Sequence, residues 1–148
     1  MAKNDKNGED STVQPIRKDA AETFDVLIID ASGFLHVRNP LVLKELANEL
    51  VTTDLVVEEL RDSSIAMLEE LQLNILSVNE DELERAARMA RNQRLSKADL
   101  SLLVAIELRK RGRTGLLSDD VELIKTAKRL FNIQEVVVFL KPTRQRKR

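Results

Sequence analysis

Four acidic positions repeat one arrangement along the chain. Each lies at or just after the end of a short apolar run, or in the first turn of the helix expected after it: Asp30, Glu59, Asp99 and the Asp119-Asp120 pair. The carboxyl ends of parallel strands gather along one edge of a sheet, where ligands bind, so we expect these side chains to lie together. Crowded carboxylates repel one another and raise each other's pKa, so such a group needs a cation to be stable.

The residue types restrict which cation this can be. The chain has no cysteine, and His36 is its only histidine, so thiolate and imidazole metal sites are excluded. A site built from carboxylates alone favours Mg²⁺ or Mn²⁺, which prefer oxygen ligands. Two such ions can activate a water and stabilise the leaving oxygen in phosphodiester cleavage.

Each acid also has a purely structural explanation. Ser96 and Asp99 have the spacing of a capping box, in which Asp99 only satisfies a helix end. Asp119 and Glu122 have the same spacing, so Asp119 is a candidate N-cap. Glu59 can lie on a solvated helix face. The metal hypothesis therefore depends on the acids meeting in one place.

The elements that must position these acids alternate between strands and helices. The aliphatic run 26–29, which ends at Asp30, is typical of a strand buried on both faces. A loop should follow it, and the pattern predicts further strands over 51–53, 73–78, 115–117 and 135–140. Helices are predicted over 40–50, 55–61, 64–71, 80–93, 97–111 and 120–131, with Gly112 as the cap after 97–111. We therefore expect an α/β fold of three layers, α/β/α, around a central parallel sheet of about five strands.

Length and composition indicate a single folded domain. With 148 residues, 43% hydrophobic and 33% charged, and a net charge of −1, the chain can bury one core and is not a polycation. No apolar run approaches the ~20 residues of a membrane span, and no signal peptide precedes the domain, so we expect a cytoplasmic protein with no membrane contact. The polar residues 1–22 predict a disordered leader, 23–141 the domain, and 142–148 a basic tail.

Four segments appear in the order expected of a PIN-domain nuclease. They are Ile-Asp-Ala-Ser-Gly-Phe at 29–34, Val-Val-Glu-Glu-Leu-Arg-Asp at 56–62, Leu-Ser-Lys-Ala-Asp-Leu-Ser-Leu-Leu at 95–103, and Leu-Ser-Asp-Asp-Val-Glu-Leu at 117–123. The resemblance covers about residues 24–140. Within that superfamily, the Leu-Arg-Asp segment, the Leu-Ser-x-x-Asp motif and the Asp-Asp pair are most similar to the Nob-type endonucleases of small-subunit ribosomal RNA maturation. Those proteins usually add a zinc ribbon, which a chain without cysteine cannot build.

The resemblance implies a PIN-like fold and a role for each acid. It assigns catalysis to Asp30, Glu59, Asp99 and Asp120, metal binding to Asp30, Asp99, Asp120 and Asp119, and supporting hydroxyls to Ser32 and Ser118. The implied activity is Mg²⁺- or Mn²⁺-dependent endonucleolytic hydrolysis of single-stranded RNA, which leaves a 5′-phosphate and a 3′-hydroxyl, with Glu59 orienting the attacking water. The implied partners are precursor ribosomal RNA or the pre-ribosomal small subunit and, because such domains often dimerise, a second copy of the chain.

Basic residues supply candidate contacts to the RNA backbone. They are Arg38, Lys44 and Arg61, together with Arg144, Arg146, Lys147 and Arg148 in the tail. The last eight residues of the chain, 141–148, include five basic ones; such an end can hold phosphates, and it can equally be a solvated terminus that keeps the protein soluble.

Three alternatives stay open. A VapC-type toxin ribonuclease of a toxin–antitoxin pair has the same fold and no zinc ribbon, and a catalytically silent PIN-like scaffold would bind RNA without needing a metal. A phospho-receiver domain would explain Lys141-Pro142 after the last strand. Receivers, however, need paired acids after the first strand and an aspartate ending the third, whereas this chain has Asp30 alone and Asn79.

Overall fold

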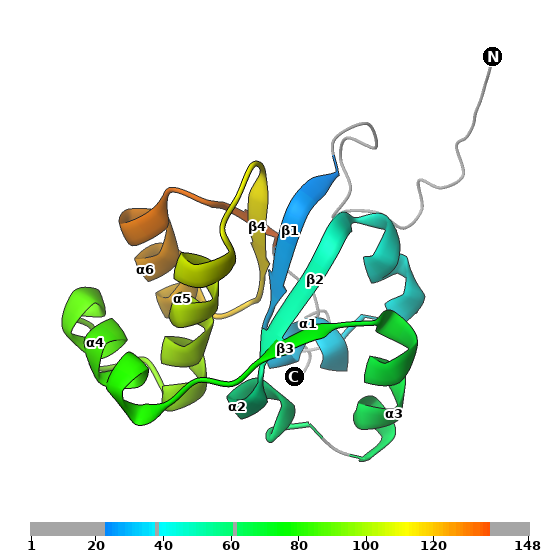
Figure 1. Cartoon of the computed structure of the whole chain (residues 1–148), viewed down its shortest axis with the longest axis horizontal. Helices are drawn as coiled ribbons and strands as arrows, with labels where there is room; N and C mark the ends of the chain where they lie inside the picture. The colour runs from blue at the N-terminus through cyan, green and yellow to red at the C-terminus, as the bar shows by residue number, and fades with distance from the viewer. Residues whose placement is uncertain (1–22, 38, 61, 137–148) are drawn as a thin grey trace, which may run out of the picture.

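A parallel five-stranded sheet forms the centre of the protein (Figure 1). The structure is a computed structural model, and it describes residues 23–37, 39–60 and 62–136. The strands are β1 (Phe24–Ile29), β2 (Ala47–Thr53), β3 (Asn74–Leu76), β4 (Thr114–Leu117) and β5 (Gln134–Val136). They are ordered β3-β2-β1-β4-β5, and every neighbouring pair is parallel.

Helices flank this sheet. They are α1 (Ala31–Leu35), the 3₁₀-helix η2 (Pro40–Glu45), α2 (Asp54–Val57), α3 (Asp62–Leu71), α4 (Glu80–Ala90), α5 (Lys97–Arg109) and α6 (Val121–Phe131). Helices α4, α5 and α6 pack together on one side, while α3 lies on the other side and contacts η2 (Figure 1). The predicted α/β/α fold with a parallel sheet of about five strands is therefore confirmed.

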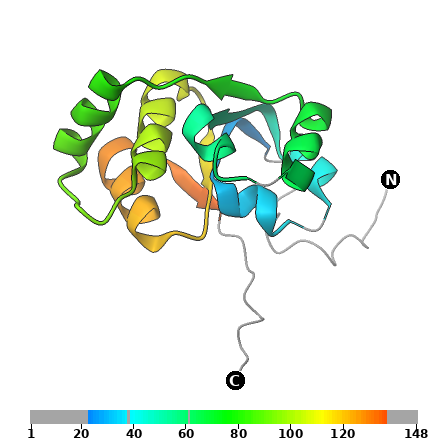
Figure 2. The same cartoon turned by 90° about the horizontal axis from the view of Figure 1, so that it is seen from below.

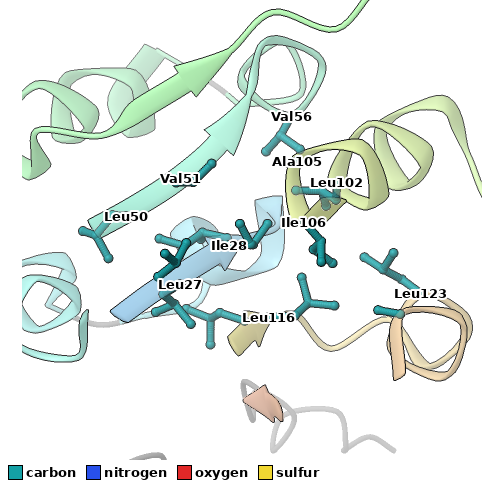
Figure 3. Close-up of a cluster of buried hydrophobic side chains, with 14 of the residues drawn as sticks. Leu27, Ile28, Leu50, Val51, Val56, Leu102, Ala105, Ile106, Leu116 and Leu123 are labelled. Carbon is teal, nitrogen blue, oxygen red and sulfur yellow. The ribbon is translucent and has the colours of Figure 1, made fainter. Parts of the chain in front are cut away.

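The core lies between the middle of the sheet and α5. Residues 26–29 of β1 are completely buried, as expected for a central parallel strand. Leu102 and Ile106 of α5 pack toward Ile28 of β1, together with side chains from β2, α2, β4 and α6 (Figure 3). Burying an aliphatic side chain of this size contributes roughly 1.5–3 kcal/mol, so this contact fixes α5 and its first turn against the sheet.

Two elements near the start of the domain differ from the prediction. The expected helix over 40–50 is wrong, because η2 ends at Glu45 and β2 already begins at Ala47. Leu43, Leu46 and Leu50 have the spacing of a helix face, but pairing with β1 places Ala47 opposite Phe24 and Leu50 opposite Leu27. This non-local pairing overrides the local pattern. The prediction of a loop after Asp30 is also wrong, because Ala31–Leu35 form the helix α1.

The turn after α5 differs as well. Lys110, and not Gly112, is the C-cap of α5. Gly112 has a φ of 54° and lies against the Asp25 carboxylate, where a Cβ would be 2.0 Å from Oδ2. Glycine is therefore needed for the close approach of the turn that leads into β4.

Several predicted segments lie outside the described residues. They are the leader 1–22, residues 137–140 of the last predicted strand, and the tail 142–148. Among the residues that the structure describes, no helix is long and apolar enough to cross a membrane.

Candidate functional site

The predicted acids lie at the carboxyl edge of the sheet. Figure 2 views the molecule from this edge, where α1, α2 and the beginnings of α5 and α6 surround the strand ends. Asp30 follows β1, Glu59 follows α2, Asp99 is in the first turn of α5, and Asp120 precedes α6. Three separate loops and one helix therefore bring acids that are distant in sequence to one end of the sheet.

Asp30 is the most constrained of these acids. Its backbone N–H donates to the Leu117 carbonyl at 3.0 Å, which extends the β1–β4 pairing. Its Oδ1 accepts from the Ala31 N–H at 2.7 Å, and its Oδ2 accepts from the Ser118 hydroxyl at 2.7 Å. Gly33 allows α1 to pack closely against the end of β1 beside Asp30, because a Cβ on residue 33 would be only 2.7 Å from Ile29 Cγ2. The carboxylate is thus buried and held through both oxygens.

Ser118 connects Asp30 to the turn that carries Asp119 and Asp120. While its hydroxyl donates to Asp30, its oxygen accepts from the Asp120 N–H at 3.0 Å. On the other side of the turn, Ser32 Oγ accepts from the Asp119 N–H at 3.2 Å. The two hydroxyls that the resemblance singled out therefore fix the backbone between β4 and α6 relative to α1.

Asp120, and not Asp119, is the N-cap of α6. Its Oδ1 accepts from the Leu123 N–H at 3.1 Å, while the Asp119 side chain is exposed. The prediction that Asp119 is the cap is wrong because α6 begins one residue later, at Val121.

The prediction of a capping box at Asp99 is confirmed. Asp99 Oδ2 accepts from the Ser96 N–H at 2.9 Å, and Ser96 Oγ accepts from the Asp99 N–H at 3.1 Å. The Asp99 side chain is nevertheless buried. The capping box thus fixes Asp99 Oδ2.

Glu59 belongs to the turn that continues α2. Its N–H donates to the Val56 carbonyl at 3.0 Å, so the backbone is held although the residue is exposed. Within residues 23–37, 39–60 and 62–136, neither of its carboxylate oxygens accepts a hydrogen bond, and neither does Asp120 Oδ2. The site thus contains both fixed and free carboxylate oxygens.

Burial and mutual repulsion raise the pKa of three of these acids. Burial raises the pKa of Asp30 from 3.8 to about 6, and the charges of Asp99 and Asp120 add to it, against the hydrogen bonds from Ser118 and Ala31. Burial, and then the charge of Asp120, also raise the pKa of Asp99. The pKa of Glu59 is raised by partial burial and by the charge of Asp99. The four acids are therefore close enough to act on one another electrostatically.

The carboxylate oxygens of the site are the kind of ligand that a hard divalent cation prefers. The described carboxylates are not, however, already arranged around a common point where such a cation could sit. The donors are all carboxylate oxygens, three of the acids have raised pKa values, and a cation would offset their repulsion. Among the described residues, however, no group of three or more His, Cys, Asp or Glu is arranged so that it could hold a metal ion. Binding would have to draw the free oxygens together or proceed through water molecules.

The predicted RNA contacts are only partly described. Lys44 is exposed in the last turn of η2. Arg38, Arg61, Arg144, Arg146, Lys147 and Arg148 lie outside the described residues.

Two buried hydroxyl residues near the acids, Thr53 and Ser101, were not predicted from the sequence. Both are completely buried. The available signal was a polar residue inside an otherwise apolar run, at the end of β2 and in the middle of α5.

No protein-family model matches this chain, and no curated protein matches it in sequence. A function for the chain therefore has to follow from the site itself.

Proposed function

We propose that the protein is a metal-dependent endoribonuclease with a PIN-like fold that hydrolyses phosphodiester bonds of single-stranded RNA in the maturation of small-subunit ribosomal RNA. The proposal depends on one observation above all. Asp30, Asp99 and Asp120 come from three different parts of the chain, and burial, with a smaller contribution from the charges of the other two, raises the pKa of Asp30. Like charges gathered at the ligand-binding edge of a parallel sheet are typical of a site that binds a cation.

Each acid has a distinct role in this proposal. Asp30, Asp99 and Asp120 would hold the cation, with Asp119 as an outer contributor. Ser118 keeps the Asp30 carboxylate oriented and ties it to the Asp120 backbone. Bound Mg²⁺ or Mn²⁺ would offset the negative charge that builds up on the phosphate during attack.

Glu59 would orient the attacking water and accept its proton. Its side chain is exposed, so water reaches it, and no described residue donates a hydrogen bond to its carboxylate. Because its pKa is raised, it is a stronger base than an ordinary glutamate. The neighbouring Asp99 charge also favours proton uptake by Glu59 during the reaction.

A second candidate is a catalytically silent RNA-binding scaffold. Two observations favour it: no described group of acids is preformed for metal binding, and Asp30, Asp99 and Asp120 each accept a helix-capping hydrogen bond. In that case the acids would only end helices, and RNA binding would not need a divalent ion.

Incubation of the full chain with precursor ribosomal RNA and Mn²⁺, followed by mapping of the new RNA ends, separates the two candidates. The nuclease should produce discrete 5′-phosphate ends that disappear with chelator and in the Asp30→Asn variant. Asp25→Asn is the matched control, since it changes an acid beside β4 at the opposite edge of the sheet, where Asp25 accepts from the Arg113 N–H. Asp25→Asn should cleave like the parent. RNA binding without any cleavage, unchanged by chelator, would instead identify the scaffold.

A further inference from the structure

Two completely buried hydroxyls lie between the elements that carry Glu59 and Asp99. Thr53 is the last residue of β2 and the N-cap of α2, and Ser101 lies in the second turn of α5. Their oxygens are 2.7 Å apart, although 48 positions separate the residues in sequence. Both side chains are completely buried, so neither is available to RNA or solvent. Their contact joins two elements of the proposed site below its surface.

The hydrogen bonds around this pair run in one direction. The Ser101 hydroxyl donates to the Ala98 carbonyl at 2.7 Å, and because a hydroxyl has one proton, its oxygen accepts from the Thr53 hydroxyl. Thr53 Oγ1 in turn accepts from the Val56 N–H at 3.2 Å. Each hydroxyl therefore both donates and accepts, so neither is left with an unmet hydrogen bond.

This chain of bonds ends beside two proposed catalytic acids. At one end, the Val56 carbonyl accepts from the Glu59 N–H at 3.0 Å. At the other end, Ala98 immediately precedes Asp99 in the first turn of α5. Because α2 has only four residues, its own hydrogen bonds cannot hold the Glu59 turn in place. Its position relative to α5 must come from contacts such as this one.

We infer that Thr53 and Ser101 are positioning residues, which set the placement of Glu59 relative to Asp99 and thereby the rate of the proposed reaction. The inference rests on the proposed function, and it adds two residues that do not touch substrate or metal. A displacement of about 1 Å in a catalytic group can cost up to about a hundredfold in rate. Loss of either hydroxyl should therefore act on the chemical step and not on RNA binding.

The kinetic test uses the full chain with Thr53→Val, which keeps the side-chain shape and removes the hydroxyl. We expect kcat to fall about tenfold or more, KM for RNA to stay within about twofold, and Thr53→Ser to restore the rate. Ser101→Ala should lower kcat in the same way, and it tests the positioning role if Thr53→Val does not fold. In a Glu59→Gln background, single-turnover cleavage should fall no further when Thr53→Val is added, because both changes act through the same group.

Thr114→Val is the matched control. Thr114 is also a buried threonine with two backbone hydrogen bonds, to Arg111 at 3.1 and 2.8 Å, but it lies at the opposite edge of the sheet. It should lower stability without changing kcat. If Thr114→Val lowered kcat as much as Thr53→Val, or if the effects of Thr53→Val and Glu59→Gln simply multiplied, the positioning role would be refuted.

A second measurement does not require activity. Amide hydrogen exchange at Val56 and Glu59, compared with amides of β1, should speed up in Thr53→Val and Ser101→Ala but not in Thr114→Val. Unchanged exchange at Glu59 would overturn the inference even if the parent cleaves RNA. If the parent cleaves no RNA while Glu59 exchange still responds to both hydroxyls, the proposed nuclease activity fails and the placement of Glu59 by this pair stands.

Discussion

A rise in pH should destabilise this protein through Asp30. The folded state keeps the Asp30 carboxyl protonated up to about pH 6, whereas the unfolded chain ionises it near its ordinary pKa of 3.8. Between these values the folded state binds the proton that the unfolded state has lost, so the free energy of unfolding falls as pH rises. The difference of about two pKa units, at about 1.4 kcal/mol each, corresponds to about 3 kcal/mol. The loss begins near pH 4 and is complete somewhat above pH 6.

Urea unfolding followed by circular dichroism in metal-free buffer measures this effect. The parent and Asp30→Asn should be compared at about pH 4 and about pH 7.5. Asn keeps an oxygen to accept from the Ala31 N–H but has no charge to bury. Asp99 and Glu59, whose pKa values are also raised, titrate in both proteins and largely cancel. Because Asp30 of the unfolded chain is already partly ionised at pH 4, we expect the parent to lose about 2.5 kcal/mol more than Asp30→Asn across this interval.

Addition of Mn²⁺ at the higher pH extends the measurement. A cation that binds the folded state should raise the free energy of unfolding of the parent and have a much smaller effect on Asp30→Asn. If the pH dependence were the same in both proteins, the Asp30 carboxylate would not be buried among like charges. A cation site at this edge of the sheet would then have no electrostatic basis.

Four further substitutions, one of them a comparison on α4, test how the site is built. Ser118→Ala leaves Asp30 Oδ2 without its donor and should lower the free energy of unfolding by about 1–3 kcal/mol, measured by urea unfolding, and reduce RNA cleavage. Gly33→Ala places a Cβ within 2.7 and 2.9 Å of side chains from β1 and β4 and should cost about 1–3 kcal/mol, visible as a lower melting temperature. Ser96→Ala and Asn79→Ala each remove half of a capping box, on α5 and α4, and should each cost about 1 kcal/mol. Only Ser96→Ala should also reduce cleavage, because its box orients a proposed catalytic acid.

Local patterns predicted the features that depend on neighbouring residues. The buried run before Asp30 identified the central strand, and the Ser96–Asp99 spacing identified a capping box, because both follow from contacts within a few positions. The edge at which the acids gather then followed from the rule for parallel sheets. That is why the fold and the general place of the candidate site could be predicted.

The features that escaped prediction depend on distant residues. The start of β2 at Ala47 is set by pairing with Phe24, and not by the helix-like spacing of its leucines. The bond from Ser118 to Asp30 spans 88 positions and the Thr53–Ser101 contact spans 48, so no local pattern contains them. A sequence shows which residues carry hydroxyls, while only the packing of α5 on the sheet shows which hydroxyls meet.

Helix capping alone does not explain why these positions carry aspartate. Asparagine caps a helix about as well as aspartate, and it needs no charge to be buried. An ionised cap gains only about 0.3–1 kcal/mol from the helix dipole, whereas burial and repulsion at Asp30 cost about 3 kcal/mol at neutral pH. This cost, which already includes the repulsion from Asp99 and Asp120, exceeds the gain. Groups that destabilise the fold are typical of functional sites, so the excess cost favours a cation-binding role over a purely structural one.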